Sequence, residues 1–299
     1  MPDPYFSIIV PFYNKERYFN ACIKALLNQD FPREKYEIIA VDNNSQDASL
    51  AIVNKYPDIR LIHEKKQNPY AARNSGISNS SGSVIVFTDA DSQAPKNWLS
   101  NIYQIINEKN YDILIGWFTP TRPIRLLQIH GKLVAERIKK AIEENNPRML
   151  TACAANLTIR KEIFKTQGLF LNGSNSEDTY FVRRCFERGY KVGFDDKAKM
   201  TMNDLDSIGI FFLKNFIYGC SVRPDGDLLS FPEKVRHASI AIKIIFKYFP
   251  VGLGLIPASL CYLSGYLLTH SGILNSQRTA KLIFNYTNFM NKKACNYSQ

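Results

Sequence analysis

Residues 84–91 are Val84-Ile85-Val86-Phe87-Thr88-Asp89-Ala90-Asp91, an uninterrupted apolar run that ends in two aspartates. Short apolar runs rich in β-branched and aromatic residues are typical of strands buried on both faces of a sheet. In open α/β sheets, ligands bind beyond the carboxyl ends of such strands. The segment therefore predicts a buried strand that carries two carboxylates to the ligand-binding edge of a sheet.

Strand and helix patterns alternate on both sides of this segment. Strand patterns cover residues 7–11, 36–41, 59–63 and 112–116, and helical patterns cover residues 14–29, 48–55, 71–78, 98–108 and 126–144. This alternation predicts βαβ crossovers, in which neighbouring strands run parallel. We therefore expect an α/β fold with a mostly parallel sheet flanked by helices.

Composition narrows the class of protein. The chain has 299 residues, of which 45% are hydrophobic and 22% charged, which is typical of a globular protein and argues against disorder. The formal net charge of +11 suits nucleic acid, anionic lipid or phosphate-bearing small molecules. The basic residues are scattered and form no long arm, so we expect no nucleic-acid partner. Residues 1–14 have no signal-peptide pattern, and we expect a cytoplasmic protein.

The character of the sequence changes at about Phe211, because residues 248–277 contain no Asp, Glu, Lys or Arg. Three interpretations stay open: a helical cap on the sheet, a monotopic or re-entrant membrane contact through residues 235–275 on the cytoplasmic face, and a membrane span over residues 251–268. We predict a main domain over residues 1–205, with a donor-binding part (1–118) and an acceptor and catalytic part (119–205). An apolar helical extension would then cover residues 206–299.

Four separated segments carry residues suited to chemistry on a phosphate-bearing ligand: residues 8–14, 42–45, 89–91 and 177–178. Asp89 and Asp91 are two residues apart and would face one ligand if the strand geometry continued through them. Mg²⁺ or Mn²⁺ commonly takes one or two carboxylates together with the phosphates of a substrate. Asp178, with Glu177 beside it, is a candidate general base for an acceptor hydroxyl. Arg73 is suited to pairing with phosphate.

Together these segments resemble the family 2 glycosyltransferases, which have the GT-A fold and are mostly inverting enzymes. The likeness covers about residues 6–203. The family's first strand ends in a Val-Pro-x-Tyr-Asn segment, seen here as residues 10–14, and its second strand ends in an acidic turn, seen here as residues 42–45. Asn43 stands in that turn where the family commonly has a second aspartate.

The resemblance implies a role for each matched residue. The nucleotide donor would be bound by Pro11, Tyr13, Asn14, Asp42, Asn43, Arg73 and Asp89, and Asn156 would line the pocket for its sugar. The metal ligands would be Asp89, Asp91 and Asn203, the last standing where many members have a histidine. Asp178 would be the general base.

These observations predict an inverting, metal-dependent glycosyltransferase, with Mn²⁺ or Mg²⁺ as cofactor and a UDP-sugar as donor. A saccharide or lipid-linked acceptor is expected, in the synthesis of a cell-surface polysaccharide or glycolipid. One alternative is a degenerate module that binds a nucleotide sugar without turnover, which Asn43 and Asn203 favour. Another is a nucleotidyltransferase, although the basic glycine-rich segment usual near the first strand of such enzymes is absent.

Overall fold

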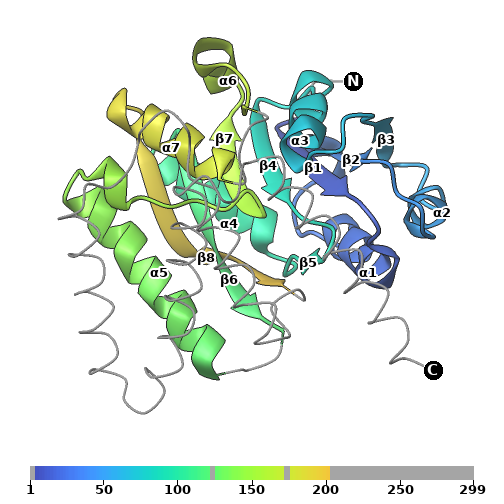
Figure 1. Ribbon diagram of the computed structural model, residues 1–299, viewed down its shortest axis with the longest axis horizontal. Helices are drawn as coiled ribbons and strands as arrows, with labels where there is room; N and C mark the ends of the chain where they lie inside the picture. The colour runs from blue at the N-terminus through green and yellow to red at the C-terminus, as the bar shows by residue number, and fades with distance from the viewer. Residues whose placement is uncertain (1–3, 122–124, 172–175, 203–299) are drawn as a thin grey trace, which may run out of the picture. The chain divides into compact units, whose positions relative to one another are not determined.

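The computed structural model describes residues 4–121, 125–171 and 176–202 (Figure 1). In this part of the chain an eight-stranded sheet has the strand order β3-β2-β1-β4-β7-β6-β8-β5. The strands are β1 (Phe6–Phe12), β2 (Tyr36–Asp42), β3 (Arg60–His63), β4 (Val84–Thr88), β5 (Ser92–Gln93), β6 (Ile113–Pro120), β7 (Asn156–Arg160) and β8 (Val192–Met202).

The first half of the sheet confirms the predicted parallel arrangement. β1 runs parallel to both β2 and β4, and β2 runs parallel to β3. The second half is mixed, because β7 is antiparallel to both of its neighbours, β4 and β6. Beyond β6, strand β8 is parallel to β6 and antiparallel to β5. The sheet thus has a parallel nucleus, formed by β1, β2, β3 and β4, and an antiparallel strand, β7, at its centre.

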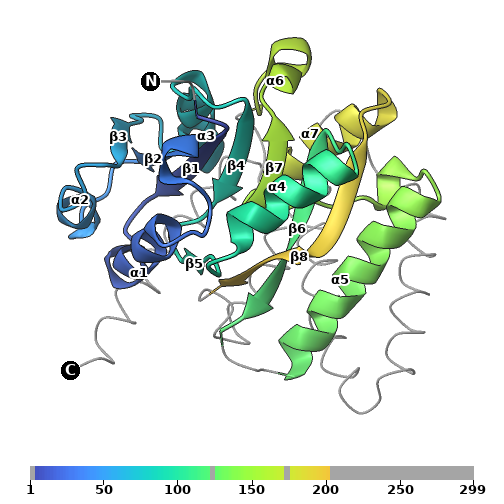
Figure 2. The same cartoon turned by 180° about the vertical axis from the view of Figure 1, so that it is seen from behind.

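Helices cover both faces of the sheet. They are α1 (Glu16–Leu27), α2 (Ser49–Val53), α3 (Pro69–Ser78), α4 (Trp98–Glu108), α5 (Arg125–Glu143), α6 (Glu162–Gln167) and α7 (Glu177–Glu187), with short 3₁₀ turns η1 (Arg33–Lys35) and η2 (Pro147–Met149). Figures 1 and 2 show α3, α6 and α7 on one face and α1 and α4 on the other.

Side chains of β1 divide between two hydrophobic cores because successive strand residues point to opposite faces. Phe6, Ile8 and Val10 belong to the core that contains residues of α1 and α4, whereas Ile9 belongs to the core that contains residues of α3, α6 and α7. All four side chains are at most 1% exposed. A strand with both faces buried has the continuous apolar pattern seen in its sequence.

The parallel nucleus sets the position of the predicted functional residues. The register aligns Phe12 at the end of β1 with Asp42 at the end of β2, and Ile9 with Phe87 near the end of β4. Because parallel strands end at the same edge, Asp42 lies at the carboxyl end of β2, and Asn14 and Asp89 lie just beyond the carboxyl ends of β1 and β4.

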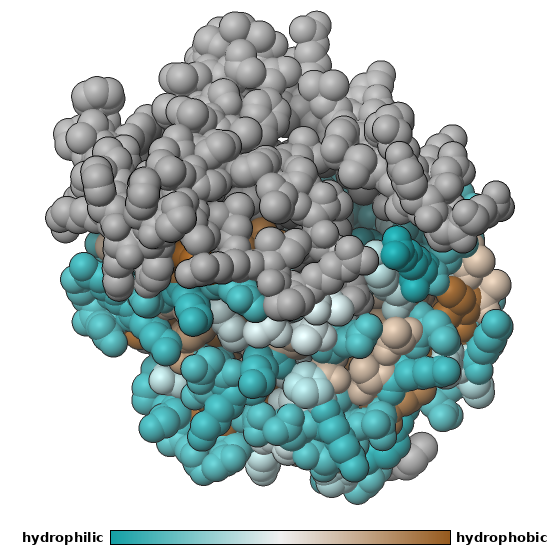
Figure 3. All heavy atoms as spheres, turned by 90° about the horizontal axis from the view of Figure 1, so that it is seen from below, coloured by the Kyte–Doolittle hydropathy of each residue, from teal (hydrophilic) through white to brown (hydrophobic). Residues whose placement is uncertain are grey.

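Several sequence predictions lie outside the described residues. They are the metal ligand Asn203, the domain boundary at residue 205, the extension over residues 206–299 and the membrane contact through residues 235–275. Within the described ranges, no helix has the length and apolar character needed to cross a membrane. On the face seen in Figure 3, the described surface is mostly hydrophilic.

Close packing of β1 against the chain that enters β4 makes Gly82→Ala a test of the parallel nucleus. An added Cβ at Gly82 would lie 2.7 Å from the carbonyl carbon of Phe6 and 2.7 Å from the nitrogen of Ser7. Because those atoms are backbone atoms of a central strand, we expect the substitution to lower the free energy of unfolding by about 1–3 kcal/mol. Urea denaturation measures this, with Ser81→Ala at the exposed neighbour as the control. Equal midpoints for the two variants would contradict it.

Candidate active site

Helix α3 places Arg73 beside Asp89. Asn68 caps the start of the helix, and its side-chain oxygen accepts hydrogen bonds from the backbone nitrogens of Tyr70 and Ala71 at 2.8 and 3.1 Å. One turn later Arg73, which is 6% exposed, donates from Nη2 to Oδ1 of Asp89 at 2.7 Å. Burial disfavours the charge of Arg73, but the negative charge of Asp89 and smaller contributions from Tyr70 and Asp178 raise its pKa above the ordinary value. Arg73 is therefore a buried, permanent cation.

Tyr70 links Arg73 to Asp178. Its hydroxyl lies 3.3 Å from Oδ1 of Asp178, and the Arg73 guanidinium lies over its ring, 5.3 Å from the centroid. Tyr70 and Arg73 are three residues apart on α3, a spacing that puts both on one face of a helix. A contiguous chain of contacts thus runs from Asp89 through Arg73 and Tyr70 to Asp178.

Asp178 lies in the first turn of α7 and is 9% exposed. Oδ2 accepts a hydrogen bond from the backbone nitrogen of Ala154 at 2.8 Å, and Oδ1 accepts one from its neighbour Thr179 at 2.8 Å. Burial raises the pKa of Asp178 above that of an ordinary aspartate, while the Ala154 hydrogen bond and the charge of Arg73 offset part of this effect. Glu177 is also buried, at 3% exposed, in the same turn.

Asp91 forms its own ion pair, with Lys15. The Lys15 Nζ lies 2.6 Å from Oδ2 of Asp91, and the two side chains are 28% and 5% exposed. The extended geometry assumed for residues 89–91 does not continue, because the nitrogen of Ser92 donates to the Asp89 carbonyl at 3.0 Å and closes a turn. Burial and, to a smaller extent, the charges of Asp91 and Asp89 raise the pKa of the Cys22 thiol, whose Sγ lies 3.6 Å from the Asp89 carbonyl oxygen.

The carboxylate pair has the donor set expected for a hard divalent cation that shares a ligand's phosphates. Within the described ranges, no group of three or more His, Cys, Asp or Glu side chains is placed to hold a metal. Two carboxylates are nevertheless enough when substrate phosphates complete the shell. Asp89 and Asp91 have this ligand chemistry, and in this structure each is paired with a cation of the protein, Arg73 or Lys15.

The turns after β1 and β2 are joined to each other by hydrogen bonds. Asn14 has a φ of 51°, a left-handed conformation that asparagine tolerates. Its side-chain oxygen accepts from the nitrogen of Gln46 at 2.8 Å, and its own nitrogen donates to Ser45 Oγ at 3.2 Å. Asp42, 5% exposed, accepts from the nitrogen of Ser45 at 3.0 Å and lies 3.3 Å from Nδ1 of His63.

Pro11 and Tyr13 belong to the same edge. Pro11 is opposite Val41 in the pairing of β1 with β2, and Tyr13 directly follows β1. Both residues are half-buried. The structure therefore brings Pro11, Tyr13 and Asn14 next to the turn that begins at Asp42.

Asn43 uses its side-chain amide within the protein. Nδ2 donates to the carbonyls of Glu64 and Lys66 at 3.0 and 2.7 Å, and Oδ1 accepts from the nitrogen of Asn68 at 3.0 Å. These bonds fix the loop between β3 and α3, and hence the start of the helix that carries Arg73. The amide donates twice to carbonyl oxygens, which the carboxylate of an aspartate is unable to do.

Asn156 has a similar structural role at the start of β7. Nδ2 donates to the carbonyls of Trp117 and Ala198 at 2.9 and 2.7 Å, and Oδ1 accepts from Trp98 Nε1 at 3.2 Å. The residue is 1% exposed. Its amide is directed at β6, β8 and α4, whereas the predicted role was to line a sugar pocket.

Sequence patterns did not single out Lys15 or Tyr70. Lys15 directly follows the Val-Pro-x-Tyr-Asn match, and Tyr70 lies one helical turn before Arg73. A signal for Tyr70 was present, because residues three apart share a helix face. No comparable local signal points from Lys15 to Asp91, since they are 76 residues apart.

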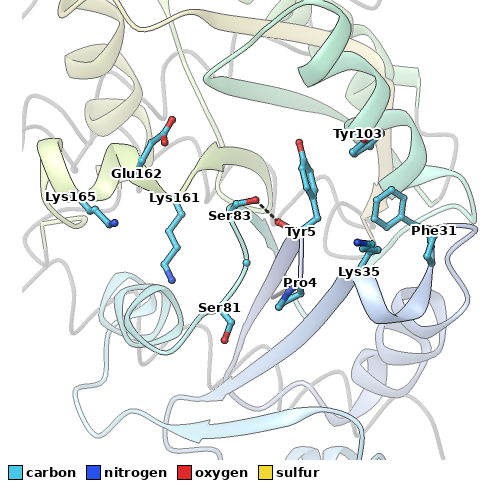
Figure 4. Close-up of a pocket in the computed structure, with 12 residues that line it drawn as sticks. Pro4, Tyr5, Phe31, Lys35, Ser81, Ser83, Tyr103, Lys161, Glu162 and Lys165 are labelled. Atoms are coloured by element: carbon cyan, nitrogen blue, oxygen red, sulfur yellow. Dashed lines mark hydrogen bonds between the residues drawn. The ribbon is translucent and has the colours of Figure 1, made fainter. Parts of the chain in front are cut away.

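A surface hollow of about 750 Å³ lies at the opposite, amino-terminal end of the parallel strands (Figure 4). Its walls combine aromatic side chains such as Tyr5 and Tyr103 with lysines such as Lys35 and Lys161. None of the site residues described above lines it. The candidate site is therefore defined by its network of charged contacts and not by this hollow.

Comparison with known proteins gives consistent results. The family described as "Glycosyl transferase family 2" matches residues 7–168. Glycosyltransferase AglE of Haloferax volcanii is 31% identical over 205 residues, which are 64% of this chain and 64% of AglE. The poly(ribitol-phosphate) β-N-acetylglucosaminyltransferase TarS of Staphylococcus aureus is 25% identical over 205 residues, which cover 34% of TarS. The matches thus span less than two thirds of these relatives.

Solved structures share the fold. The mannosyltransferase PcManGT of Pyrobaculum calidifontis, in complex with GDP-Man and Mn²⁺, has a TM-score of 0.62 at 17% identity and covers 96% of this chain and 80% of its own. TarS 1–349 of S. aureus in complex with UDP-GlcNAc has a TM-score of 0.54 at 19% identity and covers 88% of this chain and 81% of its own. At these identities the likeness shows the GT-A fold.

The Asn43 side chain clamps the loop before α3 through three hydrogen bonds. This clamp predicts that Asn43→Asp lowers the stability of the fold, although aspartate is common at this position in the family. The substitution would set a carboxylate against the carbonyls of Glu64 and Lys66, so we expect a loss of about 1–3 kcal/mol in the free energy of unfolding. Chemical denaturation measures this loss. Asn54→Asp is the matched control, since Asn54 is exposed and lies outside this loop. A stability for Asn43→Asp equal to wild type would contradict the clamp.

Proposed function

Because the chain belongs to glycosyl transferase family 2, we propose that it is an inverting glycosyltransferase that moves a sugar from a nucleotide-diphosphate donor to an acceptor hydroxyl. The observation that carries this proposal is the buried network from Asp89 through Arg73 and Tyr70 to Asp178. Through these contacts Arg73 and Asp89, which we propose face the phosphates, are connected to the candidate base Asp178.

The donor end is formed by the turns after β1, β2 and β4. Asp42 and Asn14 offer side chains and backbone groups to the nucleoside, while Asp89 and Arg73 face its ribose and phosphates in this proposal. Arg73 supports it further, because its buried Nε has no hydrogen-bond partner among the described residues. A buried guanidinium donor without an acceptor is costly unless a ligand supplies one.

The catalytic step is a single displacement. Asp178 takes the proton of the acceptor hydroxyl as its oxygen attacks the anomeric carbon, and the bond from that carbon to the nucleotide diphosphate breaks on the opposite side. The configuration at the anomeric carbon is therefore inverted. The raised pKa of Asp178 makes the carboxylate a better proton acceptor than an ordinary aspartate. Arg73 stabilises the ionised form that must accept the proton.

Asp89 and Asp91 would hold a divalent cation, Mn²⁺ or Mg²⁺, with Asn203 as the proposed further ligand. When bound, such a cation neutralises negative charge on the departing diphosphate. Mn²⁺ accompanies GDP-Man in the structure of PcManGT. For this chain, metal dependence rests on the carboxylate pair.

The proposed donor is a UDP-sugar, and the proposed acceptor is a saccharide or a lipid-linked saccharide of a cell-surface polymer. UDP-GlcNAc is bound in a TarS structure, and TarS is named as acting on poly(ribitol-phosphate). A lipid-linked acceptor would suit contact with the cytoplasmic face of a membrane through residues 235–275. Asn43 no longer favours a degenerate module, because its amide holds a loop.

Donor binding and turnover can be separated with Asp178→Asn. A panel of UDP-, GDP- and dTDP-sugars with Mn²⁺, Mg²⁺ or EDTA is tested by thermal shift, where a ligand at 100 times its Kd stabilises the fold by about 2.7 kcal/mol. We expect a shift for one nucleotide class in wild type and in Asp178→Asn. Turnover of that donor with a saccharide acceptor should fall by roughly 10²–10⁴ in the variant, because only the base is lost.

Asp196→Asn, at an exposed position of β8, is the matched control for Asp178→Asn and should keep full turnover. No thermal shift with any donor would refute the nucleotide-sugar function. Full turnover in Asp178→Asn would refute the assignment of the base and leave the donor site standing.

The acid limb of the pH–rate profile should depend on Tyr70. The base must be ionised, so kcat/KM falls as the pH drops through the raised pKa of Asp178. The Tyr70 hydrogen bond lowers that pKa, and Tyr70→Phe therefore raises it and moves the acid limb to higher pH. The profile of kcat/KM against pH measures this. Tyr103→Phe, at the opposite end of the strands, should leave the limb unchanged, and an unmoved limb in Tyr70→Phe would contradict the contact.

A further inference from the structure

Lys15 occupies a distinct position among the cations of the site. Arg73, its counterpart on Asp89, is only 6% exposed and also acts on Asp178. Lys15 pairs with Asp91 at 2.6 Å, and its side chain is 28% exposed. The partner is nearly buried, with 5% of its side chain exposed. The flexible lysine thus neutralises Asp91, the less exposed of the two aspartates, and the buried arginine neutralises Asp89.

The backbone of Lys15 is fixed by a hydrogen bond, whereas its side chain extends to Asp91. The Lys15 nitrogen donates to Ser49 Oγ at 2.8 Å, and Ser49 is completely buried. The preceding residue, Asn14, is held by Ser45 and Gln46. A lysine side chain is a flexible four-carbon stem with a point charge at its tip. Its ammonium is therefore able to change partner without movement of the backbone.

From this arrangement we propose that Lys15 is a resident counter-cation of Asp91, which a divalent metal has to displace and which then pairs with the diphosphate of the donor. The inference rests on the proposed function and adds to it the order in which Lys15, the metal and the diphosphate exchange partners. Without a nucleotide, the ammonium competes with metal for Asp91. With a nucleotide diphosphate present, phosphate oxygens offer the ammonium a new partner, and Asp91 becomes available.

This exchange couples the metal to the nucleotide. Each ligand removes an obstacle to the other, so each must raise the affinity of the other by the same factor. The exchange also keeps the site electrically balanced in both states, because Asp91 always has a cation. A nearly buried carboxylate without one would be destabilising.

The test compares wild type with Lys15→Met, using Mn²⁺ alone as the probe. Free Mn²⁺ is titrated by electron paramagnetic resonance in the absence and presence of UDP or GDP, whichever the thermal-shift panel selects. Without nucleotide, we expect Lys15→Met to bind Mn²⁺ roughly tenfold more tightly than wild type, as for the loss of a part-buried competing ion pair. The enhancement of Mn²⁺ affinity by nucleotide should shrink in the variant.

The melting temperature distinguishes the proposed role of Lys15 from a purely structural one. Lys15→Met removes a positive partner of a nearly buried carboxylate, so the melting temperature of the variant should fall in EDTA and recover with Mn²⁺. A lysine that only supports the fold would give the fall without the recovery. Lys15→Arg keeps the charge and should behave as wild type with Mn²⁺ alone. Lys24→Met, on the exposed side of α1, removes the same charge elsewhere and should leave both readouts unchanged.

The outcomes separate this inference from the proposed function. Unchanged Mn²⁺ affinity in Lys15→Met, together with nucleotide-dependent Mn²⁺ binding in wild type, overturns the counter-cation and leaves the transferase standing. Absence of any nucleotide effect in wild type overturns the coupling and the proposed donor site together. Tighter Mn²⁺ binding in Lys15→Met that persists in Lys15→Met/Asp91→Asn would place the metal elsewhere and overturn the inference as well.

Discussion

The buried ion pair between Arg73 and Asp89 is the interaction on which the rest of the site depends. A guanidinium that is 6% exposed needs compensation, and the 2.7 Å contact with Asp89 supplies most of it. Because Arg73 is carried by α3 and Asp89 follows β4, this pair fixes a helix against the carboxyl edge of the sheet. Tyr70, on the same helix face, then holds Asp178 at the other end.

Charge balance organises the site around this pair. Asp89 and Asp91 are close in sequence but have different cations, one rigid and buried and the other flexible and partly exposed. Asp178 is ionisable in a buried position, with two backbone hydrogen bonds and the nearby Arg73 opposing the cost of its burial. Carboxylates with such different surroundings can take different parts in a reaction, and in the proposed function one accepts a proton while the others hold a metal ion.

Two asparagines show how the scaffold supports these charges. Asn43 holds the loop that leads into α3, and Asn156 ties β7 to β6, β8 and α4. Both amides act as donor and acceptor at once, which a carboxylate does not do. At Asn43 this gives the departure from the family's usual aspartate a reason in local structure, because the side chain donates to two carbonyl oxygens.

The sequence by itself determined the parallel nucleus, the helices around it and the edge at which Asp42, Asp89 and Asp91 lie, because periodicity and strand ends are local properties of the chain. It did not reveal β7, whose direction depends on partners far along the chain, nor the protein-internal bonding of Asn156. The pairing of Lys15 with Asp91 was equally hidden. Such contacts between distant residues are chosen by packing and by the cost of burying a charge, and only the tertiary structure decides them.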